Sequence, residues 1–539
     1  MSPRNHPGKD LSPSELVFAL NEGLKHTVYS PSYVAKHHGH LRERRADIFN
    51  SLIPQPHHAA LTASATICEE NNSFVPINRL PFDILSLIPT YLPSQRDRLR
   101  ASFVCRHWRR TLIQRGDLWS ELLLPNDEEY VKTFLKRAGG SMLDIFAHIG
   151  SFVDDWKLLF SHTMQIRSLD LTCDNWREIR EVTDLVSRPL PLLHTLVIEQ
   201  GPLSHFPFPN LASLKITASE QGFHISELLG FLEALPMLQT VVVAIGDVES
   251  GAGGDPGDRI VFLPNVNKMT LDMGTSTAAS KLGYRIATHL SCPSAKSTRF
   301  VHTKAPESMS CVGNVFPDPV AWGAIVSQYT KSPIEEVTLK IKRIRPITCK
   351  LTLRSPDAST IELLFKPKVE GGGRPGVVPN PLQVHAKVFT RAIRTVLDHP
   401  QLKNIKRLHI HHDFRFDSSV PIPGVEVGIR QLFGSLNLLD ELTIHGCDLR
   451  LYLYPQVFRP TGFAEELMVF PPTKVFTISH PMDFACYQFS KIAEVATSQC
   501  WLKKPFERLV FRGVTPPLEI KKGLEEWVGS VESYDGGGC

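Results

Sequence analysis

The sequence predicts an α/β protein in which a short helical module, residues 76–124, precedes a long array of strand–helix units. Two observations predict this fold class. In the module, apolar residues recur at every third or fourth position, which is the spacing of helices with one buried face. After the module, an apolar-x-x-apolar-x-apolar pattern recurs nine times, and such alternation is typical of half-buried strands.

The helical module begins at Leu80 and Pro81, because proline at the first helical position wastes no backbone donor. Asp83 follows in the first turn, where the helix dipole favours a carboxylate. One apolar face is predicted for this first helix, formed by Ile84, Leu85, Ile88 and Leu92. A second helix is predicted after residue 94, with an apolar face formed by Ala101, Val104, Cys105, Trp108 and Leu112. Leu118 and Trp119 close the module.

The motif L-P-x-[DE]-I-L-x-x-I, followed by V-C-x-x-W and then by L-W, resembles the F-box of fungal-type F-box proteins. An F-box is a three-helix module that docks onto the adaptor subunit of a cullin-based ubiquitin ligase. The resemblance implies that the adaptor, and through it the cullin, is a partner. It also implies an adaptor-binding site that consists of Leu80, Pro81, Ile84, Leu85, Ile88, Leu92, Val104, Cys105, Trp108 and Trp119.

Two alternatives to an adaptor-binding module stay open. Pro89 stands where the F-box family usually has Phe, and proline is predicted to kink or end the first helix because it lacks an amide donor. Loss of adaptor binding would leave a repeat-type interaction scaffold without ligase association. The module could also be a helical hairpin that packs against the rest of the chain, with Trp108 and Trp119 as core anchors.

The second predicted helix is notably basic. Its arginines could contact nucleic acid. However, Trp108 and Val104 claim one face, and the aromatic residues are not interleaved with the arginines as a stacking platform requires. A basic rim around an apolar face instead favours steering toward an acidic protein partner, and the F-box resemblance implies an acidic adaptor. The arginines of this region are Arg96, Arg98, Arg100, Arg106, Arg109, Arg110 and Arg115, opposed only by Asp97 and Asp117.

The nine repeated patterns predict strands with one solvent-exposed face, because polar residues alternate with the apolar ones. Helical segments are predicted between strands at 226–235, 320–329, 388–397 and 489–497. Strand–helix units that repeat predict a solenoid, since no unit buries its apolar face alone. The patterns are Ile166/Leu169/Leu171, Leu193/Leu196/Ile198, Leu211/Leu214/Ile216, Leu238/Val241/Val243, Val266/Met269/Leu271, Ile334/Val337/Leu339, Ile405/Leu408/Ile410, Leu439/Leu442/Ile444 and Phe506/Leu509/Phe511.

The early patterns lie roughly 18 to 28 residues apart, and this spacing resembles that of degenerate leucine-rich repeats. The Asn or Cys that normally follows each strand of such repeats is matched only by Cys447, with Asp174 and Asp413 as stand-ins. Residues 347–365 interrupt the array and alternate like a hairpin.

The predicted domains are a largely flexible N-terminal segment at 1–75, the F-box at 76–124, a leucine-rich-repeat-like solenoid at 125–515 and a C-terminal tail at 516–539.

Composition excludes several other classes of protein. A net charge of only +4 demands neither nucleic acid nor a membrane as a partner. The ten cysteines contain no C-x-x-C pair, which favours reduced thiols in cytoplasm or nucleus. No apolar run approaches the roughly 20 residues that span a bilayer, and no secretory signal is expected. We therefore expect a cytoplasmic or nuclear protein.

No catalytic, phosphate-binding or cofactor motif is found in the sequence, so neither an enzyme nor a cofactor is expected. Two histidine clusters could hold a metal, but a solvated surface is the favoured interpretation of both, and no metal is expected. They are the tail cluster His37, His38 and His40 and the strand cluster His409, His411, His412 and Asp413.

The exposed positions of the late strands turn basic and are opposed mainly by Glu441. If the strands stack side by side, these residues converge on one concave patch. The patch is predicted to bind an acidic or phosphorylated segment of a protein substrate, and a solvated face is the alternative. Its residues are Arg407, His409, His411, His445, Arg508 and Arg512. The sequence thus predicts a non-catalytic substrate-recognition subunit of a Skp–cullin–F-box ubiquitin ligase.

Overall fold

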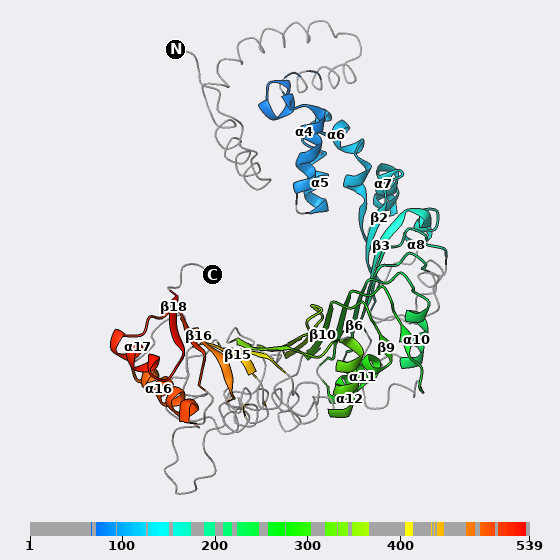
Figure 1. The fold of residues 1–539 in the computed structure, drawn as a ribbon. Helices are drawn as coiled ribbons and strands as arrows, with labels where there is room; N and C mark the ends of the chain where they lie inside the picture. The colour runs from blue at the N-terminus through cyan, green and yellow to red at the C-terminus, as the bar shows by residue number, and fades with distance from the viewer. Residues whose placement is uncertain are drawn as a thin grey trace, which may run out of the picture. The chain divides into compact units, whose positions relative to one another are not determined.

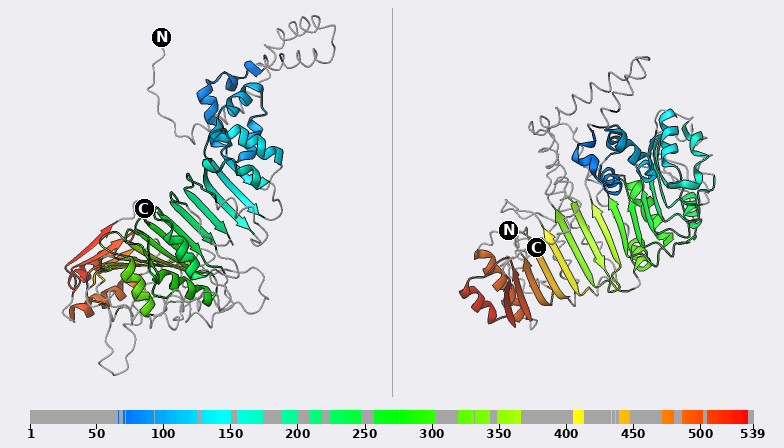
Figure 2. Two further views of the ribbon diagram at one scale, coloured as in Figure 1. Left: turned by 90° about the vertical axis from the view of Figure 1, so that its right-hand side faces the viewer. Right: turned by 90° about the horizontal axis from the view of Figure 1, so that it is seen from above.

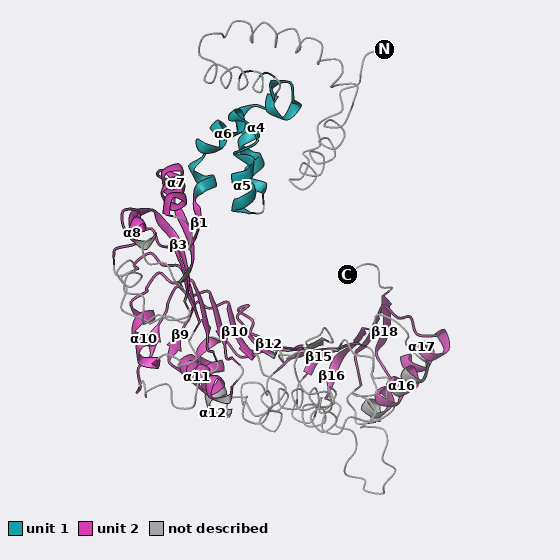
Figure 3. Ribbon diagram, turned by 180° about the vertical axis from the view of Figure 1, so that it is seen from behind, with its two compact units in different colours: residues 1–119 teal, residues 120–539 magenta. Residues whose placement is uncertain are grey.

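The structure, a computed structural model, divides into two compact units, Met1–Trp119 and Ser120–Cys539 (Figure 3). It describes residues 66, 70, 72–92, 94–124, 128–149, 155–173, 188–199, 208–217, 224–246, 257–274, 276–302, 319–330, 332–342, 348–365, 405–412, 433, 436, 439–446, 471–479, 486–501 and 505–534. The predicted flexible segment at 1–75 and the helix at 388–397 lie mainly or wholly outside these residues, as do Asp174, Asp413, Cys447 and the tail histidines.

The described part of the first unit is helical. Short α-helices alternate with 3₁₀ turns in the order η1 Pro76–Arg79, α4 Phe82–Leu87, η2 Ile88–Tyr91, α5 Gln95–Ala101, α6 Arg106–Ile113 and η3 Gly116–Trp119 (Figure 1). Pro89 lies at the start of η2, so the α-helix ends before it, as the missing amide donor predicts. The proline ring is buried. The chain therefore continues as a tighter turn.

The second helix of the module is not one continuous run, as predicted, but two helices. Cys105 precedes α6 in an extended conformation, with φ −159° and ψ 173°, and this separates α6 from α5. The backbone N–H groups of Phe103 and Val104 donate to carbonyls three residues earlier, which tightens the end of α5. Arg109 of α6 caps the free carbonyl of Ser102, at 3.2 Å. Val104 consequently lies in the turn rather than on a buried helix face.

The second unit is organised around one 16-stranded sheet, in which β12 alone runs antiparallel to its neighbours (Figure 2). Along the sheet the strands lie in the order β1-β2-β3-β4-β5-β6-β8-β10-β13-β12-β11-β14-β15-β16-β17-β18. Their bounds are β1 Glu121–Leu124, β2 Leu143–Ile149, β3 Ile166–Cys173, β4 Thr195–Glu199, β5 Ser213–Thr217, β6 Thr240–Ala244, β8 Lys268–Asp272, β10 Ser297–His302, β11 Glu336–Lys342, β12 Thr348–Arg354, β13 Thr360–Phe365, β14 Arg407–His412, β15 Leu439–Gly446, β16 Thr473–Ser479, β17 Arg508–Arg512 and β18 Ser530–Tyr534.

Each of the nine repeated patterns ends in a strand of this sheet, although its first apolar residue often precedes the strand. The hairpin predicted at 347–365 is the antiparallel pair β12–β13. The pattern missed β1, β2, β10, β16 and β18. In β2, for example, the buried alternate positions are Leu143, Ile145 and Ala147. A small separate sheet pairs β7 Val261–Phe262 with β9 Leu290–Ser291.

Most described helices of the second unit cover one face of the sheet (Figures 1 and 3). The apolar positions of each strand are buried toward these helices, and the alternate positions are mostly half-buried. In β4, β5 and β6, for example, buried and half-buried residues alternate along the whole strand. We call the other face, which carries no described helix, the bare face. The helices are α7 Glu128–Ala138, α8 Asp155–Leu159, α10 Ile225–Glu233, α11 Thr277–Thr288, α12 Pro319–Tyr329, α16 Cys486–Trp501 and α17 Leu518–Glu525.

Two asparagines in the loops before β5 and β8 donate hydrogen bonds to backbone carbonyls of earlier loops. Asn210 Nδ2 donates to the carbonyl of Pro191 at 2.7 Å, and Asn265 Nδ2 donates to that of Pro236 at 2.9 Å. These bonds satisfy loop carbonyls that would otherwise have no partner in a turn between strands. The asparagines precede their strands, whereas the leucine-rich-repeat resemblance placed such residues after them.

The prediction of a C-terminal tail at 516–539 is wrong for most of that segment. Residues 516–534 contain α17 and β18, and β18 pairs in parallel with β17. Leu524, Val528 and Val531 are buried there, so this segment closes the core at the end of the sheet. The predicted boundary after residue 124 also differs from the structure, because residues 121–124 form β1 of the second unit.

Two leucines of α17 test whether this segment is structural. Leu524 is fully buried, whereas Leu518 is 68% exposed. We predict that Leu524→Ala lowers the free energy of unfolding of the second unit by about 2–5 kcal/mol, because it leaves a cavity. The matched change Leu518→Ala should alter stability by less than about 0.5 kcal/mol. Urea unfolding followed by far-UV circular dichroism measures both, and equal effects would contradict the placement of α17 in the core.

Candidate functional site

The helical module is held by two tryptophans whose ring N–H groups are bonded inside it. Trp108 of α6 donates to Asn78 Oδ1 of η1 at 2.7 Å, and Trp119 of η3 donates to the carbonyl of Leu112 at 2.9 Å. Both rings are buried, as is Leu85 of α4. Buried Trp requires such a partner for its N–H, so these bonds fix how η1, α6 and η3 pack.

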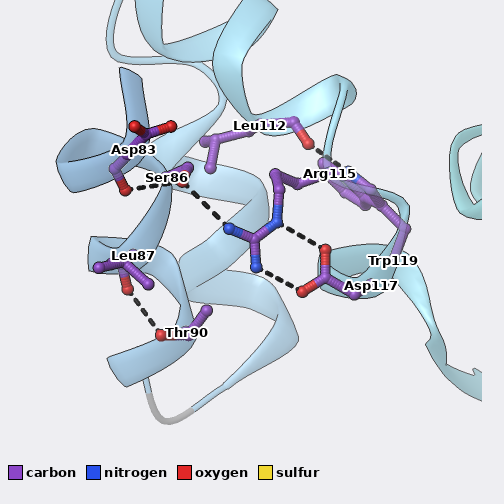
Figure 4. A network of polar contacts seen from close by, with 8 residues as sticks. All are labelled: Asp83, Ser86, Leu87, Thr90, Leu112, Arg115, Asp117 and Trp119. Carbon is purple, nitrogen blue, oxygen red and sulfur yellow. Dashed lines mark hydrogen bonds and ion pairs between the residues drawn. The ribbon is translucent and has the colours of Figure 1, made fainter. Parts of the chain in front are cut away.

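A polar network ties α4 to the end of the module (Figure 4). The Arg115 guanidinium donates to Ser86 Oγ at 3.0 Å and makes two bonds to the Asp117 carboxylate, at 2.7 and 2.6 Å. The hydrogen bonds from Arg115 lower the pKa of Asp117, and Asp117 in turn raises the pKa of Arg115. Ser86 also donates to the carbonyl of Asp83 at 2.8 Å. Two-point contact makes this pair geometrically specific.

The outer side of α4 and η2 is apolar. Ile84 and Leu87 are each 46% exposed, and Tyr91 continues their line at helical spacing. Phe82 is also exposed, and Phe103 and Val104 expose a second apolar site in the turn between α5 and α6. Contiguous exposed apolar residues on a soluble protein mark an interaction surface. We call Ile84, Leu87, Ile88 and Tyr91 the α4 stripe.

The structure separates the ten predicted adaptor-binding residues into two groups. Leu85, Trp108 and Trp119 are core residues, and they position the surface rather than form it. The remaining seven are exposed or half-buried: Leu80, Pro81, Ile84, Ile88, Leu92, Val104 and Cys105. Sequence reasoning missed Phe82, Leu87, Tyr91 and Phe103, although Leu87 and Tyr91 follow Ile84 at spacings of three and four residues.

Two arginines of the module pair with carboxylates, and a third lies over an aromatic ring. Arg100 pairs with Asp97 at 3.2 Å, and Arg115 is held in the network described above. Arg109 lies over the ring of Phe103, 5.2 Å from its centroid, where a cation is favoured. Arg96, Arg106 and Arg110 are exposed. A basic rim therefore accompanies the exposed apolar residues in this unit.

In the second unit, the predicted basic patch lies on the bare face of β14, β15 and β17. Strand register places Arg407 opposite Glu441, His409 opposite Thr443 and His411 opposite His445. The His411 and His445 rings lie 5.3 Å apart between centroids. Arg508 and Arg512 are two strands farther along, beyond β16. The six residues thus share one face.

The charge of this patch differs from the prediction, because carboxylates other than Glu441 neutralise it. Glu336 of β11 accepts a hydrogen bond from Arg354 at 3.0 Å and forms an ion pair with Arg407 at 3.4 Å. Glu532 of β18 pairs with Arg508 at 3.7 Å. Burial lowers the pKa of His409, which keeps its ring neutral near pH 7. The patch is therefore a mixed surface rather than a purely basic one.

A pocket of about 460 Å³ opens on the bare face at β15–β18. Its lining consists of Glu441, Val475, Thr477, Arg508, Val510, Arg512, Glu532 and Tyr534. It contains two of the six predicted patch residues, Arg508 and Arg512. Among the described residues, no group of three or more His, Cys, Asp or Glu side chains could hold a metal ion.

Comparison with protein families gives one match. Residues 77–125 match the F-box-like family, and this range contains the tryptophan core, the Arg115 network and the α4 stripe. No curated protein sequence matches the chain significantly. Within the part of the chain that the structure describes, no helix is long and apolar enough to cross a membrane.

The hydrogen bond between Trp108 and Asn78 generates a stability prediction. Trp108→Ala should lower the free energy of unfolding of the first unit by about 3–5 kcal/mol, a large share of what so small a module holds. Asn78→Ala should cost about 1–3 kcal/mol, since it leaves the indole N–H without its acceptor. Hydrogen exchange of α4–α6 amides measures both, and unchanged protection in Trp108→Ala would contradict this role.

The Arg115–Asp117 pair predicts a dependence on pH. Because the folded pKa of Asp117 is lowered, its stabilisation is present above the pKa of the unfolded state and is lost as pH falls through the folded pKa. The pair is partly exposed, so we expect Asp117→Asn to cost at most about 1 kcal/mol at pH 7. That difference should shrink below about pH 4. A difference that stays constant down to pH 2 in urea unfolding would exclude an ionic contribution.

Proposed function

We propose that residues 77–125 dock the adaptor subunit of a Skp–cullin–F-box ubiquitin ligase and that the bare face of the second unit binds a protein substrate. F-box domains bind Skp-type adaptor subunits, and F-box proteins are generally non-catalytic. The chain would then act by proximity, because it would hold a substrate near a conjugating enzyme elsewhere in the assembly.

The observation that carries the adaptor-binding part is the exposed α4 stripe within the matched range. A helix whose outer side is apolar gains by covering that side, and each Ile or Leu side chain removed from water contributes about 1.5–3 kcal/mol. The module already buries Leu85 and Trp108 on its inner side. Its outer apolar residues therefore have no role in its own core and are available to a partner.

The geometry around Pro89 favours adaptor binding over the alternative of a scaffold without ligase association. The ring of Pro89 is buried on the inner side of the module, at the start of η2, where a missing amide donor costs little. Ile84, Leu87 and Tyr91 consequently lie on both sides of the proline without interruption of the apolar line. The loss of Phe at this position is offset by Leu87 and Tyr91.

The exposed arginines fit an acidic protein partner. Arg96, Arg106 and Arg110 are exposed in the same module as the α4 stripe. Such positive charge speeds association with a negatively charged partner. Nucleic-acid binding is less well supported, because Arg100 and Arg115 are paired with carboxylates.

The second unit would select the substrate. We propose that its strand–helix units form a leucine-rich-repeat-like solenoid, in which the covered face supplies stability and the bare face is free to vary. Polar and charged side chains project from the bare face on every strand pair, and they can change without cost to the core. Patch residues Arg407, His409, His411, His445, Arg508 and Arg512 are part of this proposed substrate surface.

Adaptor binding can be tested on the α4 stripe itself. We predict that Ile84→Asp and Leu87→Asp each weaken binding of a purified Skp-type adaptor at least about tenfold, since each removes apolar burial and places a charge at the interface. Isothermal titration calorimetry measures the effect. Phe262→Asp, at an apolar residue of the second unit with 62% exposure, is the matched control.

The variants should keep the fold of the module, because Ile84 and Leu87 lie outside its core. Thermal unfolding monitored by tryptophan fluorescence checks this through Trp108 and Trp119. Folded variants that bind the adaptor as tightly as the wild-type chain would refute the proposed docking surface. A wild-type chain that does not bind the adaptor at all would favour the scaffold alternative.

A further inference from the structure

The pocket on the bare face of β15–β18 combines an apolar floor with charged walls. Val510 and Thr477 are buried although they point to the bare face, and Val475 lies beside them. Neighbouring strands carry charged residues at the position of Val475, namely Glu441 on β15 and Arg508 on β17. The side chains of β16 that line the pocket, Val475 and Thr477, are uncharged and therefore form a depression between charged strands.

Four charged residues line this pocket, and two of them are neutralised within it. Arg508 pairs with Glu532 at 3.7 Å, and the Tyr534 hydroxyl donates to the same carboxylate at 2.8 Å. Glu441 accepts only a bond from the neighbouring Thr443 hydroxyl, at 3.2 Å. Within the described ranges, neither Glu441 nor Arg512 forms an ion pair. One anion and one cation in the pocket thus lack a counter-charge.

The strand register fixes where these two charges lie. Glu441 is in register with Val475 and Arg508, and Arg512 lies four residues beyond Arg508. Two strand spacings and four residues of strand rise separate their Cα atoms by about 16 Å. Both side chains are long and line the same pocket. Opposite charges about four residues apart on an extended peptide match this separation.

The mixed charge argues against a simple anion as occupant. A phosphate that approaches Arg512 also meets Glu532, and a polyanion that extends along the pocket meets Glu441 as well. Like charges within one interface are unfavourable. A segment with a basic side chain for Glu441, an acidic one for Arg512 and small apolar residues between them meets no such repulsion. The apolar residues would lie over Val475 and Val510.

We infer that this pocket binds an extended peptide segment of the protein substrate that carries one basic and one acidic side chain about four residues apart. This inference rests on the proposed function, in which the bare face binds the substrate, and it replaces the expectation of a purely acidic or phosphorylated segment. Glu441 and Arg512 are the selectivity-determining residues, and Arg508 with Glu532 keeps the wall between them neutral.

Charge-reversal variants of the whole 539-residue chain test this selectivity. The probes are fluorescein-labelled synthetic peptides with Val and Thr between two charged positions four residues apart. They carry Lys and Glu in either order, two Lys or two Glu. Fluorescence anisotropy measures their binding to the wild type, to Glu441→Lys, to Arg512→Glu and to the double variant. Lys268→Glu, an exposed residue on the bare face of β8, is the control for a general charge effect.

We expect the wild type to prefer one Lys/Glu peptide over both like-charged peptides by about tenfold. Glu441→Lys should transfer the preference to the peptide with two Glu, and Arg512→Glu should transfer it to the peptide with two Lys. The double variant should prefer the Lys/Glu peptide of opposite order. Lys268→Glu should leave the order of preference unchanged.

Two outcomes would overturn the inference. First, Glu441→Lys or Arg512→Glu could change the affinity for all four peptides by the same factor as Lys268→Glu does. The pocket would then not distinguish between charges. Second, free Lys-Glu dipeptide could compete as well as the long peptides, which would make a small zwitterion the ligand. Adaptor binding by each variant is measured in parallel. If the wild type binds the peptides selectively but does not bind the adaptor, the ligase proposal is refuted and the inference about peptide selectivity stands.

Discussion

The alternation of apolar and polar residues along each strand is the constraint on which the second unit depends. Leu196, Leu214 and Val241 are in register across β4, β5 and β6 and are fully buried. A shift of one residue in any strand would turn its apolar side chains to the bare face. Burial therefore fixes the register of the whole sheet, and the register in turn fixes which polar side chains meet on the bare face.

The helical module has few residues with which to make a core. Its stability comes from the buried Trp108 and Trp119 and from hydrogen bonds of defined geometry to Asn78 and Leu112. Arg115 connects α4 to η3 through Ser86 and Asp117 (Figure 4). Because these contacts determine the packing of the inner side, the outer side of α4 is free to remain apolar and is suited to a partner.

The repeated local pattern predicted nine of the 16 strands, because in those strands six residues suffice to show which positions are buried. The errors arise where a distant segment decides the outcome. Glu336 neutralises Arg407 across some 70 positions of sequence, and Glu532 neutralises Arg508 from the last strand. Val104 has helical spacing, yet it lies in a turn, because the extended Cys105 separates α6 from α5. The segment after 515 contains few apolar residues, but Leu524 completes the core at the sheet end.

The two candidate surfaces use different physical means of binding. The α4 stripe offers apolar area, whose contribution depends little on the exact identity of the partner and little on salt. The pocket at β15–β18 offers one uncompensated charge of each sign, and such charges discriminate between partners more than they add affinity. The proposed function pairs one constant partner with one selected partner, and it would need this division, since apolar burial alone cannot select among substrates. The bare face meets that need because its side chains are independent of the core that holds the strands.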